Sequence, residues 1–252
     1  ASADPGGRLA SCRRDVSLQL PLEAFAAWVA KPSQKNLDTL LHLGAGEEDA
    51  KPGIAGEYGR YDDFVDHGEG HNVSERSTHF PQLPRLSGTL FHNAVQRFGP
   101  GVDWVMAESW LREQCTSLSN DTQLQGALMD RLKHLVNASV KHNWGAAVQG
   151  RRELPVILKL GNVILRGRID LAWQEGEAAI ALDLKTNDVL PENADELAER
   201  HGYDHQAKLY AMAYSASLGA ETAEGRLLFV PSLAEKRYDV GVDTQRYYRS
   251  RA

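Results

Sequence analysis

The sequence has few of the residues and patterns that define several large protein classes. Its two cysteines, Cys12 and Cys115, are too few for a four-cysteine zinc or iron–sulfur site, and we expect both to be free thiols. No apolar run approaches the roughly 18 residues of a spanning helix, and the N-terminus has no basic-then-apolar signal pattern. A Gly-x-x-x-x-Gly-Lys-Ser/Thr loop is also absent, so we expect no ATP bound by this chain. These absences predict an intracellular protein without membrane attachment.

Charge is distributed unevenly along the 252 residues. The net charge of -6 argues against a protein that coats a polyanion. Nine acidic residues stand against two basic ones in the range 44–75, which is typical of a long surface loop. Eight basic residues stand against two acidic ones in the range 131–170, so the average hides a basic region. Because the chain starts at Ala1 and not at Met, we expect a processed product or a domain of a longer protein.

Hydrophobic periodicity predicts an α/β protein. Helices are expected at 21–30, 36–43, 87–98, 102–115, 121–149 and 193–218, with a short helix at the C-terminus, and Ser87 is expected to cap the third. Strands are expected at 154–160, 163–173, 178–185, 226–230 and 237–240, the first three as an antiparallel meander. The predicted architecture is a central mixed sheet flanked by helices. We expect residues 1–84 to form an N-terminal helical and acidic-loop region and residues 85–252 to form the core domain.

The strongest cluster of reactive side chains lies on two neighbouring strands. Gly167-Arg-Ile-Asp170 ends one strand, and Asp183-Leu-Lys185 lies on the next. A turn at 174–177 would place Asp170 opposite Ala181, with Asp183 as its diagonal neighbour on the same face. Two adjacent carboxylates need a cation between them, and Mg²⁺ or Mn²⁺ prefers such oxygen ligands.

A lysine beside that cation suits phosphodiester hydrolysis. It can hold a water molecule while the metal lowers the pKa of that water and neutralises charge on a phosphate. The alternative is that Asp183 and Lys185 form a surface ion pair worth under about 1 kcal/mol.

Four short motifs, in a fixed order, extend this interpretation. They are Gly88-Thr-Leu-Phe-His92, Gly167-Arg-Ile-Asp170, Asp183-Leu-Lys185-Thr186 and Gln206-Ala-Lys-Leu-Tyr210. Together they resemble the motifs of the RecB-type nucleases of the PD-(D/E)XK superfamily, which includes the nuclease domains of helicase–nuclease recombination enzymes. The resemblance implies a restriction-endonuclease-like core for residues 85–252.

The resemblance also implies roles for individual residues. It implies that the metal ligands are His92, Asp170, Asp183 and the backbone carbonyl of Leu184, and that Lys185 orients or activates the attacking water. Gln206 and Tyr210, one helical turn apart, would position Lys185 or the nucleic acid strand. Glu153 would support the metal site without binding the metal directly. Gly167 would allow the backbone to approach the metal site closely.

The implied function is that of a DNA nuclease, more specifically an exonuclease, that depends on Mg²⁺ or Mn²⁺. The resemblance further implies that it is the nuclease domain of a helicase–nuclease in DNA repair or recombination, cytoplasmic or nucleoid-associated, with a helicase motor as partner. Nucleic-acid contacts are expected from Arg151, Arg152, Arg166, Arg168 and Trp144, the last by stacking on a base. Alternatively, the basic run is only a solvated face.

Two other functions remain open from the sequence. The chain could be a catalytically inactive DNA-binding or scaffold module with the nuclease fold. It could also hydrolyse a small phosphate ester, which would require an enclosed pocket in place of an open basic cleft. His92 alone, on the apolar helix 87–98, would otherwise be interpreted as a core histidine.

Overall fold

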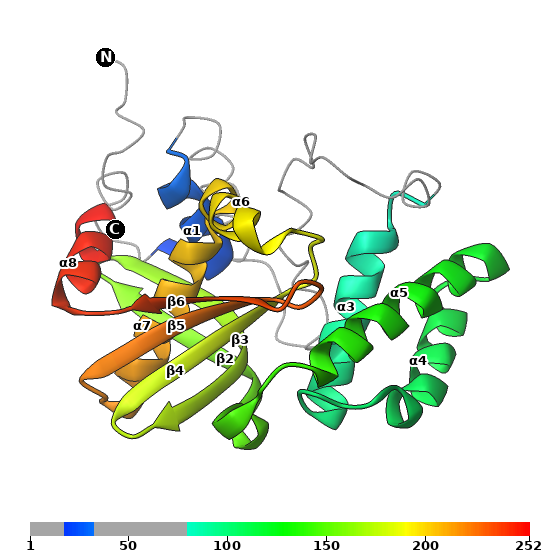
Figure 1. Ribbon diagram of the computed structural model, residues 1–252. Coiled ribbons are helices and arrows are strands. Elements are labelled where there is room, and N and C mark those ends of the chain that lie inside the picture. Colours follow the sequence, from blue (N-terminus) through cyan, green and yellow to red (C-terminus); the bar gives the residue numbers. More distant parts are fainter. Residues whose placement is uncertain (1–17, 33–79) are drawn as a thin grey trace, which may run out of the picture.

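The computed structural model describes residues 18–32 and 80–252. The predicted helix at 36–43 and the acidic range 44–75 lie outside these residues, as does Cys12. The described part is an α/β structure in which a six-stranded mixed sheet carries helices on both faces, as predicted (Figure 1). No helix among the described residues is both long and apolar enough to cross a membrane. The division at residue 84 stays a prediction.

The predicted antiparallel meander is present. Its strands are β2 (Arg151–Leu160), β3 (Val163–Glu175) and β4 (Ala178–Lys185). The predicted register between the second and third strands is wrong by two residues, because Ala181 pairs with Ala172 and not with Asp170. The cause is the turn, which is the two-residue Gly176-Glu177 and not four residues, with Gly176 at a φ of 62°.

A short strand that the sequence did not predict, β1 (Leu18–Pro21), pairs in parallel with residues 163–166 of β3. The β2 ladder covers residues 163–172 of β3, whereas β4 pairs with residues 171–175. Since a strand has only two edges, β1 and β4 must share the edge opposite β2. Residues 167–170 of β3 lie between them, so Asp170 lies in a gap where no strand pairs along that edge.

The sheet continues beyond β4 in the predicted direction. Strand β5 (Thr222–Phe229) runs parallel to β4, and β6 (Ala234–Asp239) pairs with β5 antiparallel. Both match predicted strands with shifted ends. The parallel pairing requires a crossover, and the helices after β4 supply it.

One face of the sheet is covered by helices α1 (Leu22–Ala30) and α7 (Tyr203–Leu218), with α6 (Ala194–His201) beside them and α8 (Val242–Arg251) at the C-terminus (Figure 1). The prediction of one helix over 193–218 is wrong. Gly202, with a φ of 70°, separates α6 from α7. A Cβ at Gly202 would lie 3.0–3.1 Å from atoms of Ala26, Ala27 and Ala30 in α1, so the break allows α1 to pack closely.

Helices α3 (Leu83–Phe98) and α5 (Thr122–Val140) lie on the other face, and α4 (Trp104–Leu118) packs against both of them. The predicted cap at Ser87 is wrong: α3 begins four residues earlier, with Pro84 in its first turn, and the buried Ser87 hydroxyl donates to the Pro84 carbonyl. Asp103 and Asp121 cap α4 and α5 through their carboxylates. The long predicted helix 121–149 ends at Val140, and a separate 3₁₀ turn, Gly145–Gln149, leads into β2.

Candidate active site

The gap in the sheet turns the Asp170 side chain toward two neighbours. Its Oδ2 accepts a hydrogen bond of 2.7 Å from the Leu184 backbone N–H, and its Oδ1 lies 2.9 Å from His92 Nδ1. The alternation of side chains between the two faces of β3 also shifts by one residue here. Ile169 and Ala172 both pack toward α1 and α7, although residues three apart on a regular strand point to opposite faces. The buried carboxylate is thereby held between β4 and α3.

Three possible metal ligands converge at this point. Single ligand atoms of His92, Glu153 and Asp170 all lie within 4.8 Å of one another, and this is the one such group of three found among the described residues. His92 comes from α3, Glu153 from β2 and Asp170 from β3. Glu153 has a φ of 50°, a left-handed conformation that a non-glycine residue rarely adopts. Its Oε2 also lies 3.7 Å from the Arg168 guanidinium.

These three residues fit a divalent cation. Two carboxylates and an imidazole supply oxygen and nitrogen ligands of the kind that Mg²⁺ and Mn²⁺ accept. The two carboxylates repel each other unless a positive charge lies near both. Leu184 approaches the same point, since its N–H faces Asp170, and in an extended strand the carbonyl of a residue points to the same side as its N–H.

A second set of side chains surrounds Lys185. Its Nζ lies 3.0 Å from Asp183 Oδ2 and donates to Gln206 Oε1 at 3.1 Å, and it also lies 4.1 Å from the centre of the Tyr203 ring. Burial raises the pKa of Asp183 from 3.8 to about 6, although the Lys185 charge acts in the opposite direction. Lys185 and Asp183 are therefore a buried and mutually compensating pair, and the interpretation as an exposed surface pair does not apply.

Helix α7 completes this second set. Gln206 Nε2 donates to Asp183 Oδ1 at 3.3 Å and to the Tyr210 hydroxyl at 3.4 Å, and Tyr210 in turn donates to Glu23 of α1. Burial raises the pKa of both Tyr210 and Glu23. The predicted pairing of Gln206 with Tyr210 over one helical turn thus forms part of a continuous hydrogen-bonded chain.

The arginines predicted to contact nucleic acid lie at the surface. All four are exposed, on β2 and β3: Arg151, Arg152, Arg166 and Arg168. Gly167 faces α1 and α7, and alternation along the strand places its two arginine neighbours on the opposite face, the one on which α3 lies.

Trp144 does not join these arginines. It is only 8% exposed, and its indole N–H donates to the Ser139 carbonyl at 2.9 Å. The ring packs against His142 and under Gly101, where a Cβ would lie 2.7 Å from it. Since base stacking needs an exposed ring face, the expectation that Trp144 stacks on a base is not supported.

Two residues of this region were not predicted from the sequence. Tyr203 gave no signal, because its contact with Lys185 depends on the break at Gly202. Glu23 does have a sequence signal. It is the only charged residue of the otherwise apolar helix α1, and a lone acid on a buried segment needs a partner.

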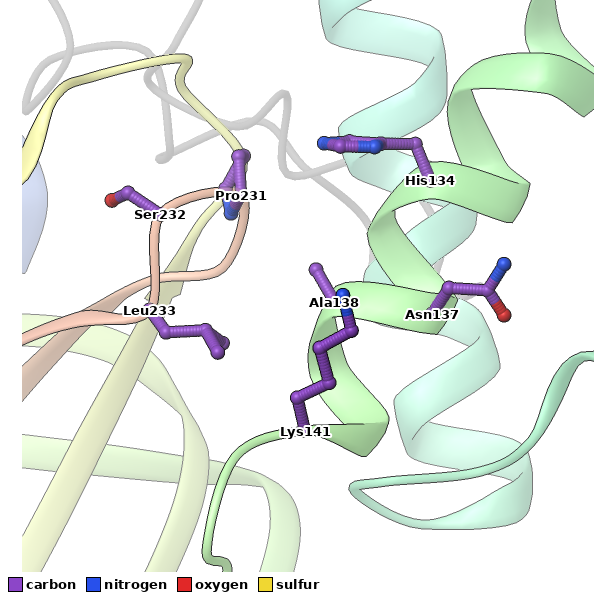
Figure 2. Close-up of a pocket in the computed structure, with 7 residues that line it drawn as sticks. All are labelled: His134, Asn137, Ala138, Lys141, Pro231, Ser232 and Leu233. Carbon is purple, nitrogen blue, oxygen red and sulfur yellow. The ribbon is translucent and has the colours of Figure 1, made fainter.

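A separate pocket of about 150 Å³ lies between α5 and the β5–β6 turn, lined by His134, Asn137, Ala138, Lys141, Pro231, Ser232 and Leu233. Figure 2 shows the Ser232 hydroxyl pointing away from α5. No residue of the candidate site lines this pocket.

Comparisons with known proteins identify the family of the chain. No curated protein matches the chain. Among solved structures, SSO0001 is 15% identical, with 56% of this chain and 65% of that chain aligned at a TM-score of 0.31, so just under two thirds of that protein is spanned. A candidate exonuclease from Eubacterium rectale is 10% identical, with 71% and 81% aligned at a TM-score of 0.32. These TM-scores are too low to transfer a substrate. The family model of the PD-(D/E)XK nuclease superfamily matches residues 67–250, well over half of the chain, which therefore belongs to the PD-(D/E)XK nuclease superfamily.

Proposed function

We propose that the protein is a RecB-type DNA exonuclease that depends on Mg²⁺ or Mn²⁺ and serves as the nuclease domain of a helicase–nuclease in DNA repair or recombination. One observation carries the proposal: three possible metal ligands, His92, Glu153 and Asp170, lie together beside a largely buried lysine that is paired with Asp183 and hydrogen-bonded to Gln206. Membership of the nuclease superfamily supports hydrolysis of a phosphodiester.

Each residue near the gap has a proposed role. His92, Glu153 and Asp170 would hold the cation, with Asp183 and the Leu184 carbonyl completing its surroundings. This set differs from the sequence expectation in two respects. Glu153 moves from a supporting role to that of a ligand, and Asp183 lies outside the group of three and pairs with Lys185. A bound divalent cation would neutralise charge on the phosphate and lower the pKa of a water molecule. The Leu184 N–H fixes Asp170 Oδ2, which leaves Oδ1 directed toward His92.

Lys185 would orient the attacking water. Its ammonium is held by Asp183, by Gln206 and by the Tyr203 ring, so few rotamers remain open to it. A side chain that is already ordered loses little entropy when it takes part in the reaction, and this preorganisation is the main contribution a protein makes to such chemistry. The exposed arginines of β2 and β3 would guide the phosphate backbone toward the gap.

The RecB-type assignment and the helicase partner rest on the four ordered motifs. A helicase motor would deliver a strand at high effective concentration, so weak binding of free DNA is expected of this chain alone.

The test is a cleavage assay with linear double-stranded, circular and single-stranded DNA, with Mg²⁺, Mn²⁺ or EDTA. The wild type should degrade linear or single-stranded DNA only with metal and should leave closed circles intact. Asp183→Ala and Lys185→Ala should each lose roughly a hundredfold to ten-thousandfold in rate. Glu177→Gln, at the exposed β3–β4 turn, is the control. If no DNA is cut under any metal condition, or both site variants cut as the wild type does, the proposal fails and an inactive DNA-binding module remains.

A further inference from the structure

Glu23 lies outside the region that the nuclease family model matches, which begins at residue 67. It belongs to α1, which follows β1, and β1 pairs with β3 just before the gap at 167–170. This pairing brings the first turn of α1 to the candidate site. The helix is otherwise apolar, with Leu22, Phe25 and Trp28 buried against the sheet and α7.

A directed chain of hydrogen bonds joins Glu23 to Lys185. The Tyr210 hydroxyl donates to Glu23 Oε1, Gln206 Nε2 donates to the Tyr210 oxygen at 3.4 Å, and Lys185 Nζ donates to Gln206 Oε1 at 3.1 Å. The contact between Tyr210 and Glu23 spans 187 residues of sequence.

The direction of this chain depends on its end. A tyrosine hydroxyl has one proton, and an amide has distinct donor and acceptor ends. While the Tyr210 hydroxyl donates its hydrogen bond to Glu23, the Tyr210 oxygen can only accept. Together with Asp183 Oδ1, it then keeps Gln206 Nε2 facing this side. The acceptor end of Gln206 then faces Lys185. Without Glu23, Tyr210 can donate to Gln206, and an amide turned to accept that proton would present its NH₂ group to the ammonium of Lys185.

The surroundings of Gly167 are independent evidence that β3, α1 and α7 pack closely at this point. A Cβ there would lie 2.8 Å from the Tyr210 ring, 3.1 Å from the Leu22 side chain and 3.2 Å from Glu23 Oε1. The absence of a side chain at Gly167 thus lets the β3 backbone, Tyr210 and the start of α1 meet at one point.

We propose that Glu23 is a positioning residue for Lys185, acting through Tyr210 and Gln206. Its effect on cleavage rests on the proposed nuclease function, whereas its effect on the Lys185 side chain does not. Glu23 itself does not touch the reacting atoms. Its role is to set the orientation of the Gln206 amide and, through it, the place of the ammonium.

The experiment compares Glu23→Leu, which keeps bulk but removes the acceptor, with Glu23→Gln, which retains a carbonyl acceptor. Single-turnover cleavage by Glu23→Leu should be slower by roughly ten- to a hundredfold, by analogy with the loss of a hydrogen-bond partner that orients a metal ligand. The dissociation constant for DNA should stay unchanged. Glu23→Gln should recover most of the lost rate, and the exposed Glu177→Gln should match the wild type.

Two further measurements separate positioning from loss of fold. Glu23→Leu combined with Tyr210→Phe should be no slower than Tyr210→Phe alone, because both act through one chain. Acetylation of Lys185 in the folded protein, followed by mass spectrometry of its peptide, should be several-fold faster in Glu23→Leu and in Tyr210→Phe than in Glu23→Gln. Tyr210→Phe keeps the aromatic ring, so it tests the chain even where Glu23→Leu does not fold.

The outcomes decide between the two proposals. Unchanged cleavage and unchanged Lys185 acetylation in Glu23→Leu would overturn the role of Glu23 while the nuclease function stands. If Lys185 is acetylated faster in Glu23→Leu but the wild type cuts no DNA, the role of Glu23 is supported and the nuclease function is refuted. Additive rate losses in the double variant would indicate that Glu23 acts only on general stability.

Discussion

The two halves of the candidate site solve opposite electrostatic problems. The ligand half, His92, Glu153 and Asp170, gathers two carboxylates around one imidazole and so attracts a cation. The lysine half, Lys185, Asp183, Gln206 and Tyr210, already contains its cation and surrounds it with acceptors. A buried charge is tolerated when it is paired and hydrogen-bonded. The ligand half therefore needs an external positive charge, whereas Lys185 already has its counter-charge in Asp183.

Their origins in the chain differ in the same way. The ligand half comes from three elements that meet at the gap in the sheet, and one of its members has the unusual φ of 50° at Glu153. The lysine half is built on β4 and α7, and α1 supports it from behind through Glu23. Metal binding should therefore respond to changes around the gap, and lysine placement should respond to changes between α1 and α7.

The largest effect that would test this division is expected from Asp170→Asn. The change keeps the shape but removes the charge that links His92 to β4, so the cation should be lost. Charge stabilisation by a metal is worth several kcal/mol, and each 1.36 kcal/mol or so is tenfold, so cleavage should fall by roughly a thousandfold or more. Isothermal titration with Mn²⁺ should show no binding to this variant. Retained Mn²⁺ affinity would show that Asp170 is not a ligand of the cation.

How much of this site the sequence alone predicts depends on how far apart along the chain the contacting residues lie. Asp183 and Lys185 are two residues apart on a strand, and Gln206 and Tyr210 are one helical turn apart, so local geometry predicts both pairs. The α/β fold and the meander follow from the same periodicities. The strand register was wrong because it depends on the length of one turn, which hydrophobic pattern does not determine.

Other features depend on tertiary structure and could not be read locally. The strand β1 has four residues, too few for a periodic signal, yet it brings α1 to the site. The burial of Trp144 follows from the end of α5 at Val140, which a continuous apolar pattern concealed. Glu153 joins His92 and Asp170 only because its backbone takes a left-handed conformation, which no propensity for glutamate predicts.

A smaller effect concerns stability and pH, and it arises at Asp183, which pairs with Lys185 and lies beside the ligand half. Burial raises the pKa of Asp183 to about 6 in the folded chain without metal. The protonated form of Asp183 therefore stabilises the fold. This contribution to stability is fully present below the pKa of the unfolded chain, near 3.8, and is lost as pH rises through 6. Carboxylates must ionise to bind a cation, so added Mn²⁺ should raise the melting temperature more at pH 8 than at pH 5.

At about a hundred times its dissociation constant, Mn²⁺ should stabilise the fold by about 2.7 kcal/mol, which is roughly 5–10 °C for a chain of this size. Glu153→Gln should shrink this shift at pH 8, because it removes one carboxylate of the ligand half, whereas Glu177→Gln should not. Differential scanning fluorimetry measures both. A shift that is equal at the two pH values, or unaffected by Glu153→Gln, would place the cation away from these carboxylates.

The smallest expected effect concerns how a strand approaches the ligand half. Arg166 is exposed on β3, four residues before Asp170, on the face where α3 supplies His92. Replacing it with Gln should weaken DNA binding only a few-fold, since one phosphate contact is lost, and should reduce the slope of log affinity against log salt by about 0.7–0.9. Arg246→Gln, on α8 after the edge strand β6, should leave the slope unchanged. Cleavage of bound DNA should stay the same in both, because Arg166 belongs to neither half. If Arg246→Gln changed the slope and Arg166→Gln did not, the nucleic acid strand would lie against α8, and the ligand half could not meet a phosphate from the face of α3.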